Sequence, residues 1–322
     1  RSSDLNGANQ VEAQVVISND LYVGLGNAVS DAEVWKCANC ATSPVWTQIG
    51  GDGLNSGWAE GTHEEVAAMV TDGTNIYVGL GSSTLDAEVW RWNGSSWTKV
   101  GGDGVNSSFN TNYEVVSALA ISGTTVYAGL GNSAAGDAEV WRCTSCDTSP
   151  AWGGTAIGGD ALNSSWANTT YEQVVSLAVA GTNLVAGLGN TAGDGEVWST
   201  AISSISWTKR GGDGTATGGQ SWGSTNEQVT TIAANSNIIY VGLGTTPAGE
   251  AEVWRCDLSS TCTATAGWTQ VGGDGVGSSF NTNYERVWSL IVTGTTVYAG
   301  IGDTSGDAEL WKCTSCDGGS PA

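Results

Sequence analysis

The feature that most constrains the fold of this chain is a tripeptide, Glu-Val-Trp or Glu-Leu-Trp, that occurs six times. Its glutamates are Glu33, Glu88, Glu139, Glu196, Glu252 and Glu309, so successive copies are 55, 51, 57, 56 and 57 residues apart. A regular period of this length is typical of solenoids, propellers and other arrays, in which each repeat is one supersecondary unit that packs on its neighbours. The chain is therefore interpreted as six copies of one structural unit.

Each unit contains four short segments with the composition of β-strands. In the third unit these are residues 114–121, 126–131 and 137–143 and a segment that begins at Trp152. β-Branched and apolar runs of about 4–8 residues, separated by Gly, Ser, Asn and Asp, are typical of strands joined by turns. No window has the 3.6-residue period of an amphipathic helix, so no helices are expected.

Six units of four strands predict an all-β fold, a six-bladed β-propeller of four-stranded antiparallel blades. The repeats resemble kelch-like and other bacterial propeller repeats in this architecture, without matching a specific family. The GGDGVNSS turn at 101–108 superficially resembles the Asp-box of sialidase-like propellers, but its Asp, Gly and Trp spacings differ, so no residue role is transferred. The alternative fold is a stack of two β-sandwiches, which six nearly equal units make less favoured.

One propeller domain is predicted over residues 1–322. The expected blades are approximately 9–51, 63–102, 113–159, 171–212, 226–273 and 284–322, with an N-terminal segment, 1–8, near the closure of the sixth blade. The sixth blade has no Trp-initiated fourth strand. A shortened sequence or a three-stranded blade would explain this, and the alternative is that a neighbouring subunit completes the blade, since an open edge strand exposes unpaired N–H and C=O groups.

The eight cysteines form four local pairs in the loops between the third and fourth strands. The pairs are Cys37 with Cys40, Cys143 with Cys146, Cys256 with Cys262 and Cys313 with Cys316. Such pairs bind zinc where two of them converge, but these lie on separate blades, so a disulfide within each loop is predicted. Disulfides indicate an extracellular or cell-surface location. The absence of an initial Met fits removal of a signal peptide.

The charge balance is strongly acidic, with 32 Asp and Glu against 10 Lys and Arg and a net charge of −22. This charge disfavours binding to nucleic acid and to anionic membranes, and most simply keeps a surface rich in Gly, Ser, Thr and Asn in solution. No apolar run approaches the length of about 18 residues that spans a membrane, so membrane insertion is not expected.

Two sets of tryptophans stand at fixed positions of the repeat and are expected to pack between adjacent blades. The third strands carry Trp35, Trp90, Trp141, Trp198, Trp254 and Trp311, and the fourth strands begin at Trp46, Trp97, Trp152, Trp207 and Trp268. The second strands contain Gly-Leu-Gly or Gly-Ile-Gly, whose glycines leave room for a cross-strand aromatic ring to cover them.

A third set of aromatic residues follows the GGD turns and is the candidate ligand site. These residues are Trp58, Phe109, Trp166, Trp222 and Phe280, and Asn55, Asn106 and Asn163 stand beside three of them. An aromatic ring flanked by amides and hydroxyls is suited to sugars, because the ring covers the apolar face of the sugar and the polar groups bind its hydroxyls. The alternative interpretation is that each ring fills the seam between two blades.

Recurrent carboxylates are a further candidate site. Glu64, Glu114, Glu172, Glu227 and Glu285 precede the first strands, and could form a carboxylate ring at the mouth of a propeller channel. Asp52, Asp103, Asp160, Asp213 and Asp274 recur in the GGD turns, where Asp commonly hydrogen-bonds its own backbone. Clustered carboxylates could bind Ca²⁺, but no DxDxDG loop occurs, so the favoured interpretation has no metal and no cofactor.

A catalytic site is not predicted. His63 is the one histidine and stands where other blades have tyrosine, which gives no support to a Ser-His-Asp or Cys-His site. The acidic residues repeat with the blades, whereas a catalytic carboxylate pair should be used once. The favoured hypothesis is a non-enzymatic extracellular protein that self-associates into a surface layer or filament. The alternative is a multivalent lectin with glycan sites at the blade seams, and the third hypothesis is an extracellular hydrolase.

Overall fold

The structure is a computed structural model of the chain. It describes residues 10–26, 32–51, 53–58, 63, 65–81, 86–110, 113–131, 138–167, 173–189, 195–212, 222, 228–244, 251–260, 262–263, 267–273, 275–280, 284, 286–302 and 308–318. The chain divides into two compact units, residues 1–157 and 158–322, and each unit is described by itself.

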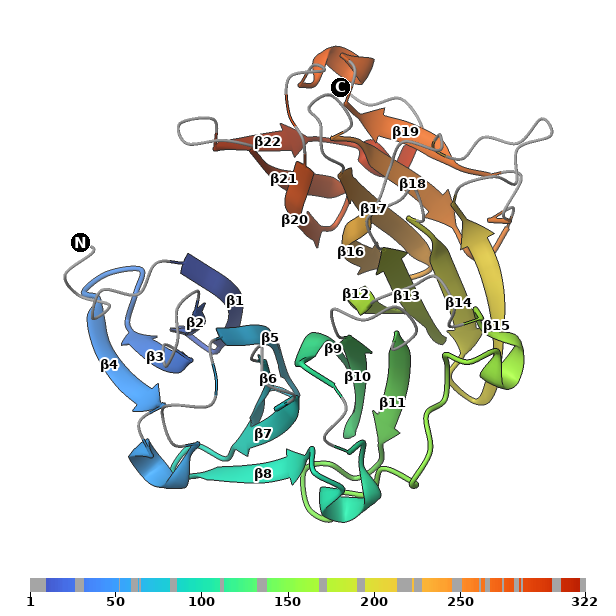
Figure 1. The fold of residues 1–322 in the computed structure, drawn as a ribbon. Coiled ribbons are helices and arrows are strands. Elements are labelled where there is room, and N and C mark those ends of the chain that lie inside the picture. The colour runs from blue at the N-terminus through green and yellow to red at the C-terminus, as the bar shows by residue number, and fades with distance from the viewer. Residues whose placement is uncertain are drawn as a thin grey trace. The chain divides into compact units, whose positions relative to one another are not determined.

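The first unit contains three antiparallel sheets, each a meander of consecutive strands (Figure 1). The first sheet is β1 (Gln10–Ile17), β2 (Asp20–Gly26), β3 (Glu33–Ala38) and β4 (Val45–Gly50), and the second is β5 (Glu65–Thr71), β6 (Ile76–Gly81), β7 (Glu88–Trp92) and β8 (Trp97–Gly101). The third is β9 (Val115–Ser122), β10 (Thr125–Gly131) and β11 (Glu139–Cys143), and it is extended by a single bridge between Thr144 and Ala151.

The second unit repeats this arrangement, again with three sheets. The fourth sheet is β12 (Gln173–Ala180), β13 (Asn183–Gly189), β14 (Val197–Ala201) and β15 (Ser204–Gly211). The fifth is β16 (Gln228–Asn235), β17 (Ile238–Gly244), β18 (Val253–Asp257) and β19 (Thr269–Gly272). The sixth is β20 (Arg286–Thr293), β21 (Thr296–Gly302) and β22 (Glu309–Cys313). Among the residues described, the third strand of the last sheet has no fourth strand beside it.

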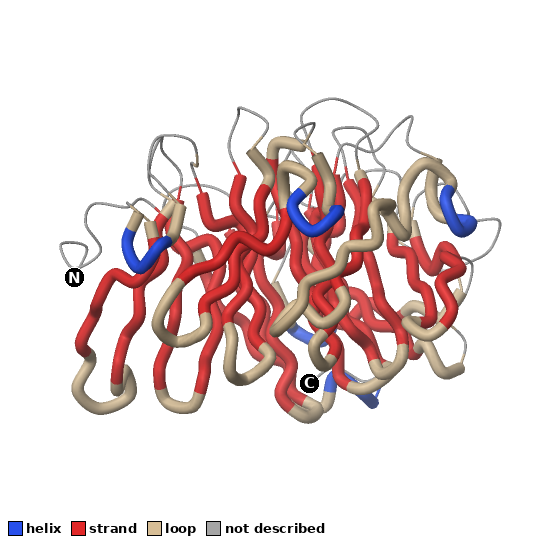
Figure 2. The backbone as a smooth tube through the Cα atoms, turned by 90° about the horizontal axis from the view of Figure 1, so that it is seen from below, coloured by secondary structure: helices blue, strands red, loops and turns tan. Residues whose placement is uncertain are grey.

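Short 3₁₀ turns are the one helical feature of the described chain (Figure 2). They are η2 (Leu54–Ser56), η3 (Val105–Ser107), η4 (Leu162–Ser164), η5 (Val276–Ser278) and η6 (Cys316–Gly318). The first four follow the GGD sequences, where the residue before each turn has a positive φ, +69° at Gly53 and +71° at Gly104. Glycine adopts this conformation without the strain that a Cβ causes, which explains its recurrence there.

Consecutive sheets of a unit meet at their first two strands through a contact that we call the inner joint. Its backbone part is one antiparallel pairing, as between Gly81 and Val115. In its side-chain part a valine of one sheet lies on a glycine of the sheet before it. A Cβ on Gly24, Gly79, Gly187 or Gly242 would lie 2.5, 2.6, 2.6 or 2.7 Å from Cγ1 of Val66, Val116, Val229 or Val287.

The inner joint corrects one sequence-based expectation. An aromatic ring was expected to cover the glycines of the Gly-Leu-Gly strands, but a valine from the next sheet covers the first of them. The valine reaches this position because a β-bulge follows it, as between Val66 and Ala68. A bulge adds one residue to a strand and redirects the side chains on either side of it.

The fourth strands meet through a second contact, the outer joint, which is made by the tryptophans that open them. The indole Nε1 atoms of Trp97, Trp152 and Trp268 donate to the carbonyl oxygens of Ile49, Val100 and Arg210, each at 2.7 Å. Each ring lies against the glycine that follows the acceptor, so that a Cβ on Gly50 would be 2.9 Å from Nε1 of Trp97. The expected packing of these tryptophans between sheets is confirmed.

Candidate functional site

The aromatic residues proposed as sugar platforms are buried in the seams between sheets. Trp58, Phe109, Trp166, Trp222 and Phe280 are each 1–3 % exposed. Four of them pack edge-on against a fourth-strand tryptophan, with ring centroids 5.1–5.5 Å apart, in the pairs Trp58–Trp97, Phe109–Trp152, Trp166–Trp207 and Trp222–Trp268. A ring enclosed in this way has no free face for a sugar, so Trp58, Phe109, Trp166 and Trp222 favour the alternative interpretation, in which each ring fills the seam between two sheets.

The asparagines beside these rings also have internal partners. The Nδ2 atoms of Asn55 and Asn106 donate to the carbonyls of Ile49 and Val100, at 2.9 and 3.0 Å. These are the carbonyls that accept the indole hydrogen bonds of the outer joint. Asn55, Asn106 and Asn163 have φ values of +54°, +54° and +52°, a conformation that asparagine tolerates better than most residues. Asn55 and Asn106 therefore hold the turn onto the fourth strand, which leaves their donors less suited to a sugar.

The glutamates of the repeated tripeptide, five of them buried and Glu309 exposed, make a recurrent carboxylate–indole contact that sequence reasoning missed. In all six copies the carboxylate accepts the indole N–H of the tryptophan two residues later, at 2.6–2.8 Å. Gln48 and Gln270 donate to the second oxygen of Glu33 and Glu252, and Lys99 and Lys209 do so at Glu88 and Glu196. The recurrence of Lys or Gln two residues after the tryptophan of the fourth strands, in Trp-Thr-Lys/Gln, was the sequence signal that could have predicted these partners of the glutamates.

Glu88 has the most polar surroundings of these carboxylates. Burial by itself raises its pKa, but hydrogen bonds from His63, Lys99 and Trp90 outweigh burial and lower the pKa from 4.5 to about 2. His63 is itself buried and lies 3.3 Å from the Glu88 carboxylate through Nε2. The single histidine of the chain thus lies beside a structural carboxylate, just before the first strand of the second sheet.

The proposed ring of channel carboxylates falls mostly outside the described residues. Glu64, Glu172, Glu227 and Glu285 lie there, and Glu114 is described as half-buried, with its backbone N–H donating to the Gly131 carbonyl at 3.1 Å. Within the described ranges no group of three or more His, Cys, Asp and Glu could hold a metal ion. Asp52, Asp213 and Asp274 lie outside these ranges, so Ca²⁺ binding stays a hypothesis.

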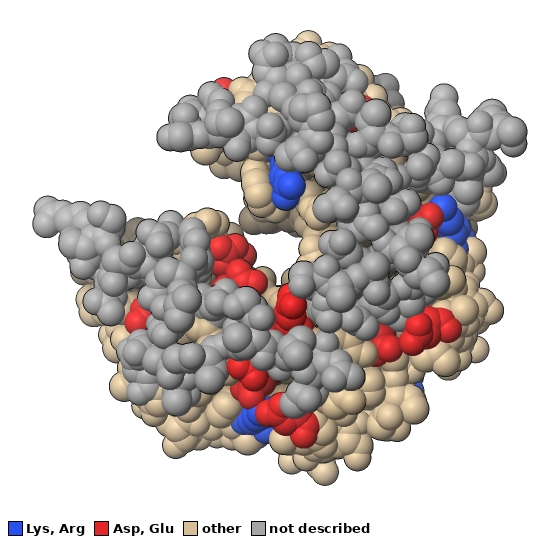
Figure 3. Space-filling model, viewed as in Figure 1, with Lys and Arg blue, Asp and Glu red and all other residues tan. Residues whose placement is uncertain are grey.

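The predicted disulfides are present, and all eight cysteines form the four expected local pairs. The paired Cα atoms lie 5.5–5.8 Å apart, within the usual range for a disulfide. In the described part of the chain no helix is long and apolar enough to cross a membrane. Figure 3 shows that the described acidic side chains lie in several separate groups and outnumber the basic ones on that face.

Among the described residues of its own unit, each of the first and sixth sheets has one half of an inner joint without the matching half. Val11 occupies the position of Val66, Val116, Val174, Val229 and Val287, all of which are 0 % exposed, yet it is 51 % exposed. Gly300 occupies the position of Gly24 and Gly79, but a Cβ added there would meet only Ser289 of its own sheet. Ile291 of the sixth sheet and Val16 of the first are also exposed apolar side chains.

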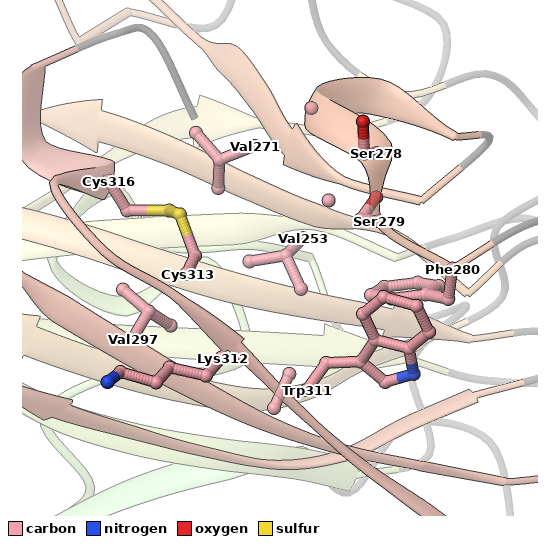
Figure 4. A pocket seen from close by; sticks show the side chains of 13 residues that line it. Val253, Val271, Ser278, Ser279, Phe280, Val297, Trp311, Lys312, Cys313 and Cys316 are labelled. Atoms are coloured by element: carbon pink, nitrogen blue, oxygen red, sulfur yellow. A yellow bond between two sulfur atoms is a disulfide. The ribbon is translucent and has the colours of Figure 1, made fainter. Parts of the chain in front are cut away.

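A cavity of about 230 Å³ lies beside the sixth sheet in the second unit (Figure 4). Its lining is mainly apolar and includes Val253, Val271, Phe280, Trp311 and the Cys313–Cys316 disulfide. Among the described residues the adjacent strand, β22, pairs only with β21. Its Leu310 is 75 % exposed, whereas Val34, Val89, Val140 and Val197 at the same repeat position are 0 % exposed. The exposed surface of the first sheet in the first unit is one candidate interaction site, and the exposed surface and cavity of the sixth sheet in the second unit are another.

Comparisons with known proteins agree on the fold. No family model matches the sequence, and no curated protein matches it. Hydrazine synthase from Kuenenia stuttgartiensis matches with a TM-score of 0.60 and 11 % identity over 95 % of this chain and 77 % of that one. A chain of the mitotic checkpoint complex matches with a TM-score of 0.58 and 14 % identity, over 95 % of this chain and 76 % of that one. The WD40 β-propeller domain of Doa1 matches with a TM-score of 0.53 and 9 % identity, over 96 % of this chain and 88 % of that one.

These likenesses and the meander sheets establish the class of protein. The chain has an all-β, β-propeller-type fold, as its repeats predicted. At 9–14 % identity the likenesses concern the fold alone. The number of blades and the single domain stay predictions.

Proposed function

We propose that this protein is a non-enzymatic structural module that works outside the cytoplasm and self-associates. In the proposed assembly the sixth sheet of one copy meets the first sheet of the next. Four disulfides support an oxidising location. The six carboxylates of the repeated tripeptide hydrogen-bond tryptophans of the frame, which supports a structural role for them.

The observation that carries this proposal is the pair of unoccupied half-joints. The first sheet presents a valine without its glycine, and the sixth presents a glycine without its valine, while four complete valine–glycine contacts hold sheets together inside the units. The two halves are therefore complementary in shape and chemistry. Because the two partners are different surfaces, the contact is heterologous and can propagate into a filament or layer.

The proposal is tested by the size distribution of the protein, measured by light scattering and negative-stain microscopy. Val11→Asp places a charge in the joint, where burial without a partner is costly, and should weaken association about tenfold or more. Val45→Asp is the matched control, because Val45 is also exposed but lies at the start of a fourth strand, outside the joint. A variant that lacks residues 1–8 tests the N-terminal segment in the same way.

Large assemblies that persist in Val45→Asp and disappear in Val11→Asp are the expected result. A single species near 32.8 kDa for the unaltered chain at every concentration would overturn self-association. Equal effects of the two substitutions would also overturn it, because the contact would then not depend on the inner joint.

A further inference from the structure

The cavity beside the sixth sheet corresponds to a site that is filled by tryptophan elsewhere in the chain. Gly50, Gly101 and Gly211 end their fourth strands, and Gly158 stands at the same position of the repeat in the third sheet. A Cβ on any of these glycines would lie within 3.0 Å of an atom of Trp97, Trp152, Trp207 or Trp268. Gly272 ends the fourth strand of the fifth sheet in the same way. A Cβ there would have Phe280 as its nearest neighbour, at 3.3 Å, and its three nearest atoms belong to Phe280 and Val253 instead of a tryptophan.

The aromatic contacts lead to the same conclusion. Trp58, Phe109, Trp166 and Trp222 each pack against the fourth-strand tryptophan of the following sheet. Phe280, the fifth member of this set, packs against Tyr284 and Trp311, and among described residues it has no fourth-strand tryptophan. Figure 4 shows the Phe280 and Trp311 rings together at one side of the cavity.

The cavity has the size and the acceptor that an indole needs. Apolar cavities of about 150 Å³ in other proteins hold a benzene ring, and this one measures about 230 Å³. Val271 precedes Gly272, as Ile49 precedes Gly50 and Val100 precedes Gly101, and the carbonyls of Ile49 and Val100 accept indole N–H groups. Gly277 stands where Asn55 and Asn106 stand in other turns, so the cavity lining has no asparagine side chain at that position and receives the smaller Ser278 from the same turn.

The free edge of β22 supplies the backbone part of the same site. In the first, second and fifth sheets the third strand pairs with a fourth strand that begins at or next to a tryptophan, and in the fourth sheet it pairs with β15, which contains Trp207. These strands share the sequence Trp-Thr-Lys/Gln-x-Gly. An extended segment that pairs with β22 in the same register would cover Leu310 with its glycine and place its tryptophan at the cavity.

We propose that β22 and the cavity around Val271, Gly272 and Phe280 form a peptide-binding site for an extended segment that begins Trp-Thr. The segment adds one strand to the sheet, its indole fills the cavity, and the indole N–H donates to the Val271 carbonyl. Backbone pairing provides affinity and the indole provides selectivity, as in other cases of strand addition. This site is separate from the inner half-joints and does not depend on self-association through them.

The test is a titration of the full chain with a fluorescently labelled peptide of residues Ser95–Gly102, SSWTKVGG, read by fluorescence anisotropy. The protein carries Val11→Asp, so that self-association does not compete. Replacing the tryptophan of the peptide by alanine should weaken binding about tenfold or more, since buried tryptophans dominate such contacts. Replacement by phenylalanine should weaken it about fivefold, because the Val271 carbonyl then loses its donor.

A protein variant and its control locate the site. Gly272→Leu places its Cβ in tight contact with Phe280, 3.3 Å away, extends a side chain into the cavity, and should abolish binding. Ser289→Leu adds the same side chain at an exposed position outside the cavity and should leave the affinity unchanged. Slower amide hydrogen exchange over Glu309–Cys313 on peptide addition is expected, because those amides become paired.

Equal affinities for the three peptides, or undiminished binding to Gly272→Leu, would overturn the indole site. If Gly272→Leu fails to fold, the peptide series on the unaltered cavity decides alone. A chain that is monomeric without any substitution but selects the tryptophan peptide would refute the proposed self-association and leave this inference in place. A chain that assembles but binds the three peptides equally would refute the peptide-binding site and leave the proposed self-association in place.

Discussion

At the scale of single residues, the repeated glutamates and tryptophans matter through their hydrogen bonds. The six glutamates accept indole N–H groups, and the fourth-strand tryptophans donate theirs to backbone carbonyls. A buried donor or acceptor without a partner costs about 1–3 kcal/mol, so these pairs must be kept together. This explains why the tripeptide recurs with both residues intact in all six units.

Glu88 allows this role to be measured through its pH dependence. Its pKa is about 2 in the folded protein against 4.5 for the free side chain. A lowered pKa means that the folded state binds fewer protons, so the carboxylate stabilises the fold above pH 4.5. This stabilisation is lost as the pH falls from 4.5 towards 2. Glu88→Gln should therefore lower the free energy of unfolding by about 3 kcal/mol at pH 7, and by progressively less below pH 4.5.

Urea denaturation at a series of pH values measures this effect, with Glu309→Gln as the control. Glu309 has the same indole partner but is exposed, so its substitution should cost less than about 1 kcal/mol. A cost for Glu88→Gln that is the same at pH 7 and pH 3 would contradict the ionic role of this carboxylate.

At the scale of the elements, the sheets are joined by close contact of glycine with valine and with tryptophan. The second strands have glycine because a valine of the next sheet occupies the space that a Cβ would need. The fourth strands end in glycine because an indole ring of the next sheet occupies that space. Strand composition alone does not show this, since glycine in a strand usually weakens it. The recurrence of glycine at the same repeat position was the visible sign of a close approach.

Gly79→Ala and Gly300→Ala compare an occupied inner joint with an unoccupied one. Alanine at position 79 would place its Cβ 2.6 Å from Cγ1 of Val116 and 2.7 Å from the Val116 carbonyl oxygen. We expect a loss of about 2 kcal/mol or more, because overpacking forces backbone shifts. Alanine at position 300 would meet only the Ser289 hydroxyl, at 2.6 Å, which can rotate away. Its cost should stay within about 0.5 kcal/mol.

Urea denaturation of both variants decides the comparison. Equal losses of stability would show that Gly300 already packs against a valine within the same chain, contrary to the half-joint described above. In the proposed assembly, Gly300→Ala should instead weaken association, since the incoming valine would meet the added methyl group.

At the scale of the whole molecule, the net charge of −22 opposes contact between copies. Charges more than a Debye length apart are screened, and this length falls from about 30 Å at 0.01 M salt to about 8 Å at 0.15 M. The inner half-joints are apolar, so salt should weaken the repulsion without weakening the contact itself. We expect the assembled fraction to rise as NaCl is raised over this range.

Static light scattering across a salt series measures this fraction, with the Val11→Asp variant as the reference that stays small at every salt concentration. Assemblies that dissociate as salt is raised would indicate a contact held by opposite charges, and would argue against the apolar joint proposed here.

The sequence by itself was sufficient for the repeat, the strands and the disulfides. Three features allowed this: a period near 56 residues, alternating turn and strand composition, and four close cysteine pairs. Each can be recognised from the residue order alone, without knowledge of the tertiary contacts. The sequence also identified the aromatic residues and asparagines that follow the GGD turns as special positions. It could not decide whether Trp58 faces a ligand or a neighbouring sheet.

Only the tertiary structure decided the roles of these residues, because burial depends on what another repeat places against each side chain. Trp58 is enclosed because Trp97 of the next sheet covers it, whereas Phe280, at the same repeat position, borders a cavity. Val11 and Val66 are likewise equivalent in sequence, yet one is exposed and the other is buried against Gly24. The repeats are chemically alike, and their different neighbours leave exposed apolar side chains on the first and last of them, which makes these two the candidate sites for interaction.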